Sequence, residues 1–119
     1  MQYEPIATHI YADVFGVKRE VLNDGLYLLN IMTKACFKAK VTVEDIYVKF
    51  YQPEGITVQV NLSESHANCY SYPEHEYLMV DILLCGKKDP KMILDYLIEH
   101  LKPVDYKYRK EVVGKNVGR

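Results

Sequence analysis

Residues 56–85, ITVQVNLSESHANCYSYPEHEYLMVDILLC, decide the fold of this chain. Apolar and polar side chains alternate over residues 56–63, and this period predicts a strand with one buried face. Residues 66–72 and 77–85 predict two further strands. Pro73 separates these two, because proline cannot donate a hydrogen bond within a sheet. Strands joined by such short connections are expected to pair antiparallel.

Three more strands are predicted outside this stretch, at residues 6–13, 40–51 and 104–113. The sequence QPEG at 52–55 predicts the turn that follows the strand at 40–51. Proline presets φ at its position in such a turn, and glycine tolerates a positive φ. The strands at 40–51 and 56–63 should therefore form a hairpin.

Two amphipathic helices are predicted between the strands. The first begins near Asp24, whose carboxylate is a candidate helix cap. The second begins at Asp89-Pro90, a cap followed by proline at the first helical position, and ends at Pro103. Their apolar faces are Leu28, Leu29, Met32, Ala35 and Cys36 in the first helix, and Ile93, Leu94, Leu97, Ile98 and Leu101 in the second.

The order of elements is therefore β-α-β-β-β-β-α-β. It predicts an α+β fold, a two-layer sandwich in which an antiparallel sheet carries two helices on one face. Residues 1–119 form a single domain in this interpretation, because the chain is short and no linker divides it. The second face of the sheet is expected to be covered by a partner subunit or a ligand.

Composition excludes several classes of function. The formal net charge of −1 argues against a general nucleic-acid binder, since no excess of basic residues neutralises phosphates. No apolar run is long enough to cross a bilayer, and no signal peptide is evident, so no membrane partner and a cytoplasmic location are expected. The three cysteines, Cys36, Cys69 and Cys85, are odd in number and irregularly spaced, which fits reduced thiols.

The sequence SESH places Ser65 between the carboxylate of Glu64 and the imidazole of His66. Neighbouring strand residues point to opposite faces, so Ser65 and His66 are not expected to form a nucleophile–base pair. No G-x-S-x-G sequence is present either, which argues against a serine hydrolase. A metal site built from His66, Cys69, His75 and Cys85 fits no standard zinc spacing, so no metal is expected.

The strings LSESH, YPEHEY and VDILLCG, at this spacing, closely resemble the core of the prokaryotic S-adenosylmethionine decarboxylase proenzyme family. The similarity extends along most of the chain. It includes the opening strand and helix, an aromatic-x-Pro-x-Gly turn at 51–55, and the Asp89-Pro90 helix start after the Cys-Gly pair.

This resemblance implies a pyruvoyl enzyme that cuts its own backbone between Glu64 and Ser65. Ser65 would attack the carbonyl of Glu64, and elimination followed by hydrolysis would leave a pyruvoyl group derived from Ser65 as the only cofactor. That group would form a Schiff base with the substrate amine and take up the electrons released with CO2, as pyridoxal phosphate does elsewhere. The expected product serves polyamine (spermidine) synthesis.

The resemblance also assigns roles to individual residues. Cys85 would return a proton to the substrate Cα, because a thiol is mostly protonated near neutral pH. Tyr51 would stack on adenine, Tyr72 would line the same pocket, and Glu74 would bind the ribose hydroxyls. Thr57 would assist the self-cleavage. A homodimer with sites near its interface is implied.

Three positions depart from the family pattern, and the mildest change is at Thr57, where the family usually has a serine or threonine hydroxyl and where the usual small residue that follows is Val58 here. Tyr70 stands where the family commonly has the histidine that acts as base in the elimination, and a phenol is a poor base at neutral pH. Lys49 stands where many members have a histidine. Processing could therefore use His66, His75 or water as the base. Alternatively, the chain stays intact as a nucleoside-binding or regulatory subunit, or it decarboxylates arginine or ornithine.

Overall fold

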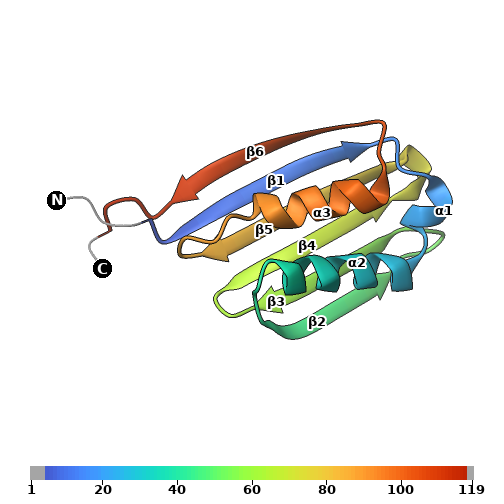
Figure 1. Ribbon diagram of the computed structural model, residues 1–119. Coiled ribbons are helices and arrows are strands. Elements are labelled where there is room, and N and C mark those ends of the chain that lie inside the picture. The colour runs from blue at the N-terminus through green and yellow to red at the C-terminus, as the bar shows by residue number, and fades with distance from the viewer. Residues whose placement is uncertain (1–4, 118–119) are drawn as a thin grey trace.

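The computed structural model describes residues 5–117, and Figure 1 shows an antiparallel sheet with two helices in front of it. The sheet has six strands in the order β2-β3-β4-β5-β1-β6. The strands are β1 (Ala7–Phe15), β2 (Val43–Phe50), β3 (Ile56–Leu62), β4 (Ser65–Tyr72), β5 (Tyr77–Cys85) and β6 (Asp105–Val113). The predicted antiparallel α+β sandwich is confirmed, with strand ends that differ from the predicted ones by three residues at most.

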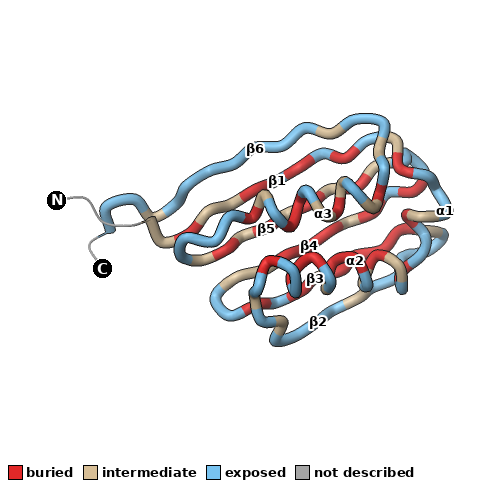
Figure 2. The backbone as a smooth tube through the Cα atoms, viewed as in Figure 1, coloured by how far each residue is buried: buried red, intermediate tan, exposed pale blue. Residues whose placement is uncertain are grey.

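The two long helices, α2 (Gly25–Lys38) and α3 (Lys91–Leu101), pack on the same face of the sheet. Figure 2 shows their buried sides turned toward the strands. Each fully buried Leu or Ile contributes about 1.5–3 kcal/mol through loss of apolar surface to water. The largest fully buried side chains are Ile10, Val14, Leu22, Leu28, Met32, Ile56, Leu78, Ile82, Leu84, Ile93, Leu94 and Leu97. No helix among residues 5–117 is long and apolar enough to cross a bilayer.

The predicted cap at Asp24 is confirmed, whereas α3 begins at Lys91 with Pro90 as its N-cap, one residue later than predicted. The Asp24 carboxylate accepts from the Tyr27 backbone N–H at 3.0 Å, and the Asp89 carboxylate accepts from the Lys91 N–H at 2.9 Å. These bonds satisfy donors that the first turn of a helix leaves without an intrahelical partner. Helix α3 ends where Lys102, before Pro103, takes a positive φ of 50°.

Two short elements were missed, the helix α1 (Arg19–Leu22) and the 3-10 turn η1 (Pro73–His75). The four residues of α1 are too few to show a helical period, and its position depends on a distant strand. The Ser71 hydroxyl in β4 donates to the Leu22 carbonyl at 2.9 Å and accepts from the Ile56 N–H at 2.8 Å. One buried hydroxyl thus joins α1, β3 and β4.

The face of the sheet turned away from α2 and α3, here called the open face, carries rows of side chains in register across the strands, and three of these rows lie near its middle. The first row contains Asn61, His66, Leu83, His9 and Glu111. The second contains Tyr47, Gln59, Asn68, Asp81, Tyr11 and Arg109. The third contains Lys49, Thr57, Tyr70, Met79, Asp13 and Lys107. All the candidate site residues lie on this face or at its two ends.

Candidate active site

The turn between β3 and β4 consists of Ser63 and Glu64, and it places Glu64 in the left-handed region with φ of 56°. That conformation costs a residue with a Cβ atom about 1–2 kcal/mol, and it persists where surrounding contacts hold it. The peptide bond between Glu64 and Ser65 therefore leaves a strained turn and enters a strand.

Cys85, at the end of β5, makes two contacts with this turn. Its backbone N–H donates to the Ser65 hydroxyl oxygen at 3.0 Å, and its thiol donates to the Glu64 carbonyl oxygen at 2.6 Å. A donor on a carbonyl oxygen stabilises the negative charge that develops there when a nucleophile attacks the carbon. The predicted grouping of Glu64, Ser65 and Cys85 is thus present within one chain.

A cavity of about 210 Å³ lies beside these residues. Ser65 and Cys85 line it together with the connection before β2, and the Lys88 ammonium donates to the Lys40 carbonyl at its edge, at 2.8 Å. The cavity gives a small molecule access to the Ser65 side chain.

A second group of candidate residues surrounds another cavity, of about 370 Å³, at the opposite end of the sheet. Five predicted residues line it: Tyr51, Thr57, Tyr70, Tyr72 and Glu74. Tyr47 and Gln59 complete its wall on the open face. The grouping of aromatic rings with a carboxylate suits a flat base and a ribose.

Local contacts fix the shape of this second cavity. The Thr57 hydroxyl donates to the Tyr51 hydroxyl at 3.2 Å, and the Lys49 ammonium lies 5.1 Å from the centre of the Tyr51 ring. The Arg19 guanidinium, together with the Asn23 amide, donates to the Glu54 carboxylate and lowers its pKa to about 2. Glu54 is therefore ionised at neutral pH and anchors the turn that carries Tyr51.

The two cavities are far apart in one chain. Ser65 and Tyr72 are the first and last residues of β4, and eight strand residues span roughly 23 Å. Tyr70 and Thr57 face each other across β3 and β4 near the Tyr72 end. The structure therefore does not bring either predicted processing residue to Ser65 of the same chain.

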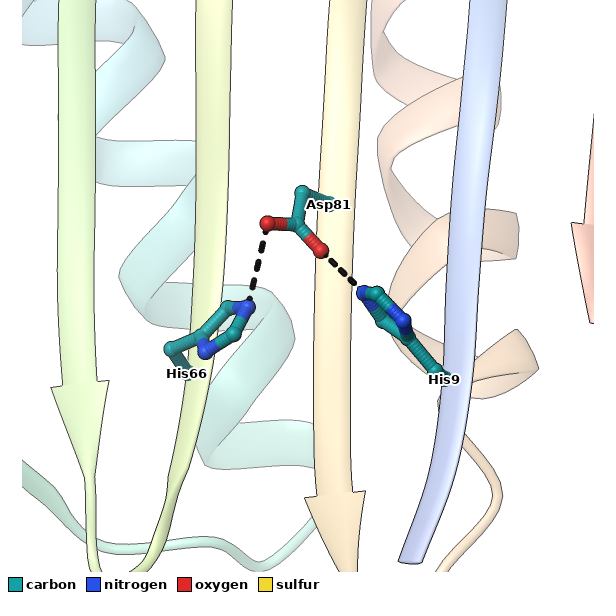
Figure 3. A group of neighbouring side chains, drawn as sticks. All are labelled: His9, His66 and Asp81. Atoms are coloured by element: carbon teal, nitrogen blue, oxygen red, sulfur yellow. Dashed lines mark hydrogen bonds and ion pairs between the residues drawn. The ribbon is translucent and has the colours of Figure 1, made fainter. Parts of the chain in front are cut away.

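His66 lies beside Ser65 in sequence, but its ring lies on the open face, 3.1 Å from Asp81 (Figure 3). This placement argues against His66 as the base for its neighbour. The alternative metal set of His66, Cys69, His75 and Cys85 does not assemble. Cys69 is fully buried on the helix side of β4, and His75 belongs to η1 at the far end.

The relative reactivity of the three cysteines tests the burial that the structure assigns to each of them. Burial raises the pKa of the Cys36 thiol to about 11 and that of Cys69 to about 12, whereas Cys85 is partly exposed. The thiolate is the reactive form, so at pH 8 the two buried thiols are almost entirely unreactive. We expect iodoacetamide to label Cys85 first, as measured by peptide mass spectrometry. Labelling of Cys36 or Cys69 at the same rate would contradict the fold, and denatured protein, labelled at all three, is the control.

Comparison with known proteins decides the family. The sequence profile described as S-adenosylmethionine decarboxylase matches residues 8–112. The chain belongs to the S-adenosylmethionine decarboxylase family. An S-adenosylmethionine decarboxylase proenzyme of Brevibacillus brevis is 37% identical over 114 residues, covering 95% of this chain and 85% of that protein. A second proenzyme, from Bacillus cereus, is 32% identical over 115 residues, covering 96% and 94%.

A solved member of the family confirms the fold. The crystal structure of the adenosylmethionine decarboxylase from Aquifex aeolicus VF5 superposes with a TM-score of 0.88 at 26% identity. The match covers 94% of this chain and 93% of that one. Members of this family are pyruvoyl-dependent, so the expected origin of the prosthetic group from a serine agrees with the family assignment.

Sequence reasoning missed His9 and Asp81, which lie beside His66 on the open face. His9 is hydrogen-bonded to Asp81 at 2.5 Å, although the two are 72 positions apart in the chain. No local motif joins them, since their proximity depends on the register between β1 and β5. Alternation within each predicted strand could have placed both residues on one face, but not next to each other.

Proposed function

We propose that this chain is a pyruvoyl-dependent decarboxylase of S-adenosylmethionine, activated by a cut between Glu64 and Ser65. The observation that carries the proposal is the contact between the Cys85 thiol and the Glu64 carbonyl, at a strained turn directly before a serine hydroxyl. Family membership supports the reaction class, and the reduced thiols suit the cytoplasm.

In the first stage the Ser65 hydroxyl oxygen attacks the Glu64 carbonyl carbon, and the Cys85 thiol stabilises the oxyanion. The Ser65 nitrogen leaves with a proton, so that an ester replaces the amide. A base, which within this chain would be water, takes the Ser65 Cα proton, and the Glu64 carboxylate is then expelled to leave a dehydroalanine. Water replaces the nitrogen, which departs as ammonia. The residues present therefore suit formation of the prosthetic group from Ser65.

In the second stage the pyruvoyl group supplies an electron sink for the loss of CO2. The chain's own residues bind and orient the substrate and deliver protons. The Cys85 thiol, which donates to the Glu64 carbonyl directly before Ser65, would deliver a proton to the Cα of a substrate bound at that position. Tyr51 and Tyr72 offer aromatic faces to the adenine, and Glu74 offers a carboxylate to the ribose.

The separation of the two cavities favours a homodimer. The nucleoside cavity and Ser65 lie farther apart than the base and the amine of one S-adenosylmethionine molecule. Two open faces that meet about a two-fold axis perpendicular to the strands would bring the nucleoside cavity of one copy over the end of the other sheet that carries Glu64, Ser65 and Cys85. In the same arrangement, Tyr70 and Thr57 of one copy would lie near the β3–β4 turn of the other copy.

Assembly can be measured directly. We expect light scattering at micromolar concentration to give about twice the chain mass of 13.9 kDa. The open face presents exposed aromatic side chains, among them Tyr11, Phe15 and Tyr47, and a second copy would remove them from water. A species of 13.9 kDa under these conditions would overturn the homodimer.

The proposed activity is tested by two measurements on one preparation. Intact mass under denaturing conditions should give two fragments, 1–64 and 65–119. Carboxyl-labelled S-adenosylmethionine should then release labelled CO2, with labelled arginine and ornithine as comparison substrates. One uncut chain without CO2 release would support the regulatory subunit that the Tyr70 substitution suggests. Release from arginine or ornithine alone would exclude S-adenosylmethionine as the substrate.

A further inference from the structure

We propose that His9, His66 and Asp81 form a binding site for a divalent transition-metal ion, of which Zn²⁺ is the best fit. The site lies on the open face, where β1, β4 and β5 are adjacent. It is distinct from both cavities described above and goes beyond the proposed decarboxylation.

Three neighbouring strands aim these side chains at one point, as Figure 3 shows. His9 and His66 lie in one row on either side of Leu83, and Asp81 lies in the next row between them. The carboxylate is 2.5 Å from His9 Nε2 through one oxygen and 3.1 Å from His66 Nε2 through the other. The three ligand atoms all lie within 4.8 Å of one another.

One buried polar atom at this place, Asn68 Oδ1, lacks a hydrogen-bond partner among the described residues, and the contact of His66 Nε2 with Asp81 is an ion-pair distance that does not meet hydrogen-bond geometry. Asn68 pairs directly with Asp81 across the strands, so its side chain shares the open face with the cluster. A buried polar atom without a partner is costly, and in native proteins it commonly indicates an ion or water. The amide oxygen of Asn68 has lone pairs suited to a cation.

The donor set matches the preference of zinc. Imidazole nitrogen at about 2.0–2.1 Å and carboxylate oxygen at about 2.0–2.2 Å are its usual ligands, in tetrahedral geometry. Such donors are about 3.3 Å apart, so small side-chain rotations on a rigid sheet would close the present site. Three protein ligands leave one position for water, for Asn68, or for a group from a second copy.

The contact between His9 and Asp81 occupies His9 Nε2, and a metal ion bound there would replace that contact. Because His9 precedes the proposed cut and the other two ligands follow it, the ion would also join the two fragments.

The test uses the full chain carrying Ser65→Ala, so that its result does not depend on self-cleavage. After treatment with a chelator, Co²⁺ is titrated and its visible absorption is recorded, and Zn²⁺ is then added in competition. We expect one ion per chain and the intense spectrum of a tetrahedral site. His9→Gln and Asp81→Asn should each weaken binding by more than the 10–100-fold typical of outer-sphere partners. His75→Gln and His100→Gln, which alter the other two histidines, should leave it unchanged.

Histidine NMR of the parent chain provides a second measurement that needs no further variant. The ring resonances of His9 and His66 should shift with Zn²⁺, and those of His75 and His100 should not. Absence of Co²⁺ and Zn²⁺ binding would overturn the proposal. So would binding that survives His9→Gln, or equal shifts of all four histidines, since both indicate adventitious surface binding.

Discussion

A Ser65→Ala variant is expected to remain a single chain of full mass and to release no CO2 from S-adenosylmethionine. The variant lacks the oxygen that attacks the Glu64 carbonyl, so neither the cut nor the prosthetic group can form. The loss should be complete rather than partial, because no other step supplies the group. Denaturing mass spectrometry and labelled-CO2 release measure the two outcomes on the same preparation.

Ser63→Ala is the matched control for this prediction. Ser63 lies in the same two-residue turn and lines the same cavity, but its hydroxyl does not precede the cleaved bond. We expect the Ser63 variant to cut normally. Ser65→Ala also removes the acceptor of the Cys85 N–H, which should lower the free energy of unfolding by about 1 kcal/mol. Two fragments from Ser65→Ala would show that another residue drives the cleavage.

The fold was largely predictable because its determinants are local. Alternation within 56–63, the break at Pro73 and the cap at Asp24 each act over a few residues, and the structure confirms them, while the start of α3 differs from the predicted one by one residue. The helix α1 was not predictable, because the Ser71 hydroxyl that holds it comes from β4, far along the chain. Short elements fixed by tertiary contacts leave no period in the sequence.

The candidate site was likewise predictable only in part. Glu64, Ser65 and Cys85 could be grouped through the family motif, and the hydrogen bonds between them agree with that grouping. The motif gave no indication that Tyr70, five residues from Ser65, lies far along the strand and on the other face. The contact of His9 with Asp81 also requires strand register, which patterning within one strand does not specify.

Tyr70→His is expected to accelerate the cut by roughly 10² to 10⁴, the usual range for a general base. An imidazole is mostly unprotonated at neutral pH, whereas a phenol retains its proton. The measurement is the fraction of cut chain against time after synthesis. Tyr47→His, which places the same side chain elsewhere in the cavity wall, should have no such effect. A wild-type chain that already cuts rapidly, with Tyr70→His neutral or slower, would show that Tyr70 is no defect.

Because Tyr70 lies far from Ser65 of its own chain, we expect a histidine introduced at position 70 to promote cleavage of the other copy in the dimer. Two differently tagged chains are produced together: one carries Ser65→Ala with Tyr70→His and cannot be cut, and the other is wild type at both positions. Within mixed dimers the wild-type chain should be cut at the accelerated rate, because its partner supplies the base. Homodimers of the wild-type chain give the reference rate. If the wild-type chain is cut no faster in mixed dimers, the base acts within its own chain. Strand β4 would then have to rearrange before cleavage, because Tyr70 and Ser65 lie on opposite faces of it.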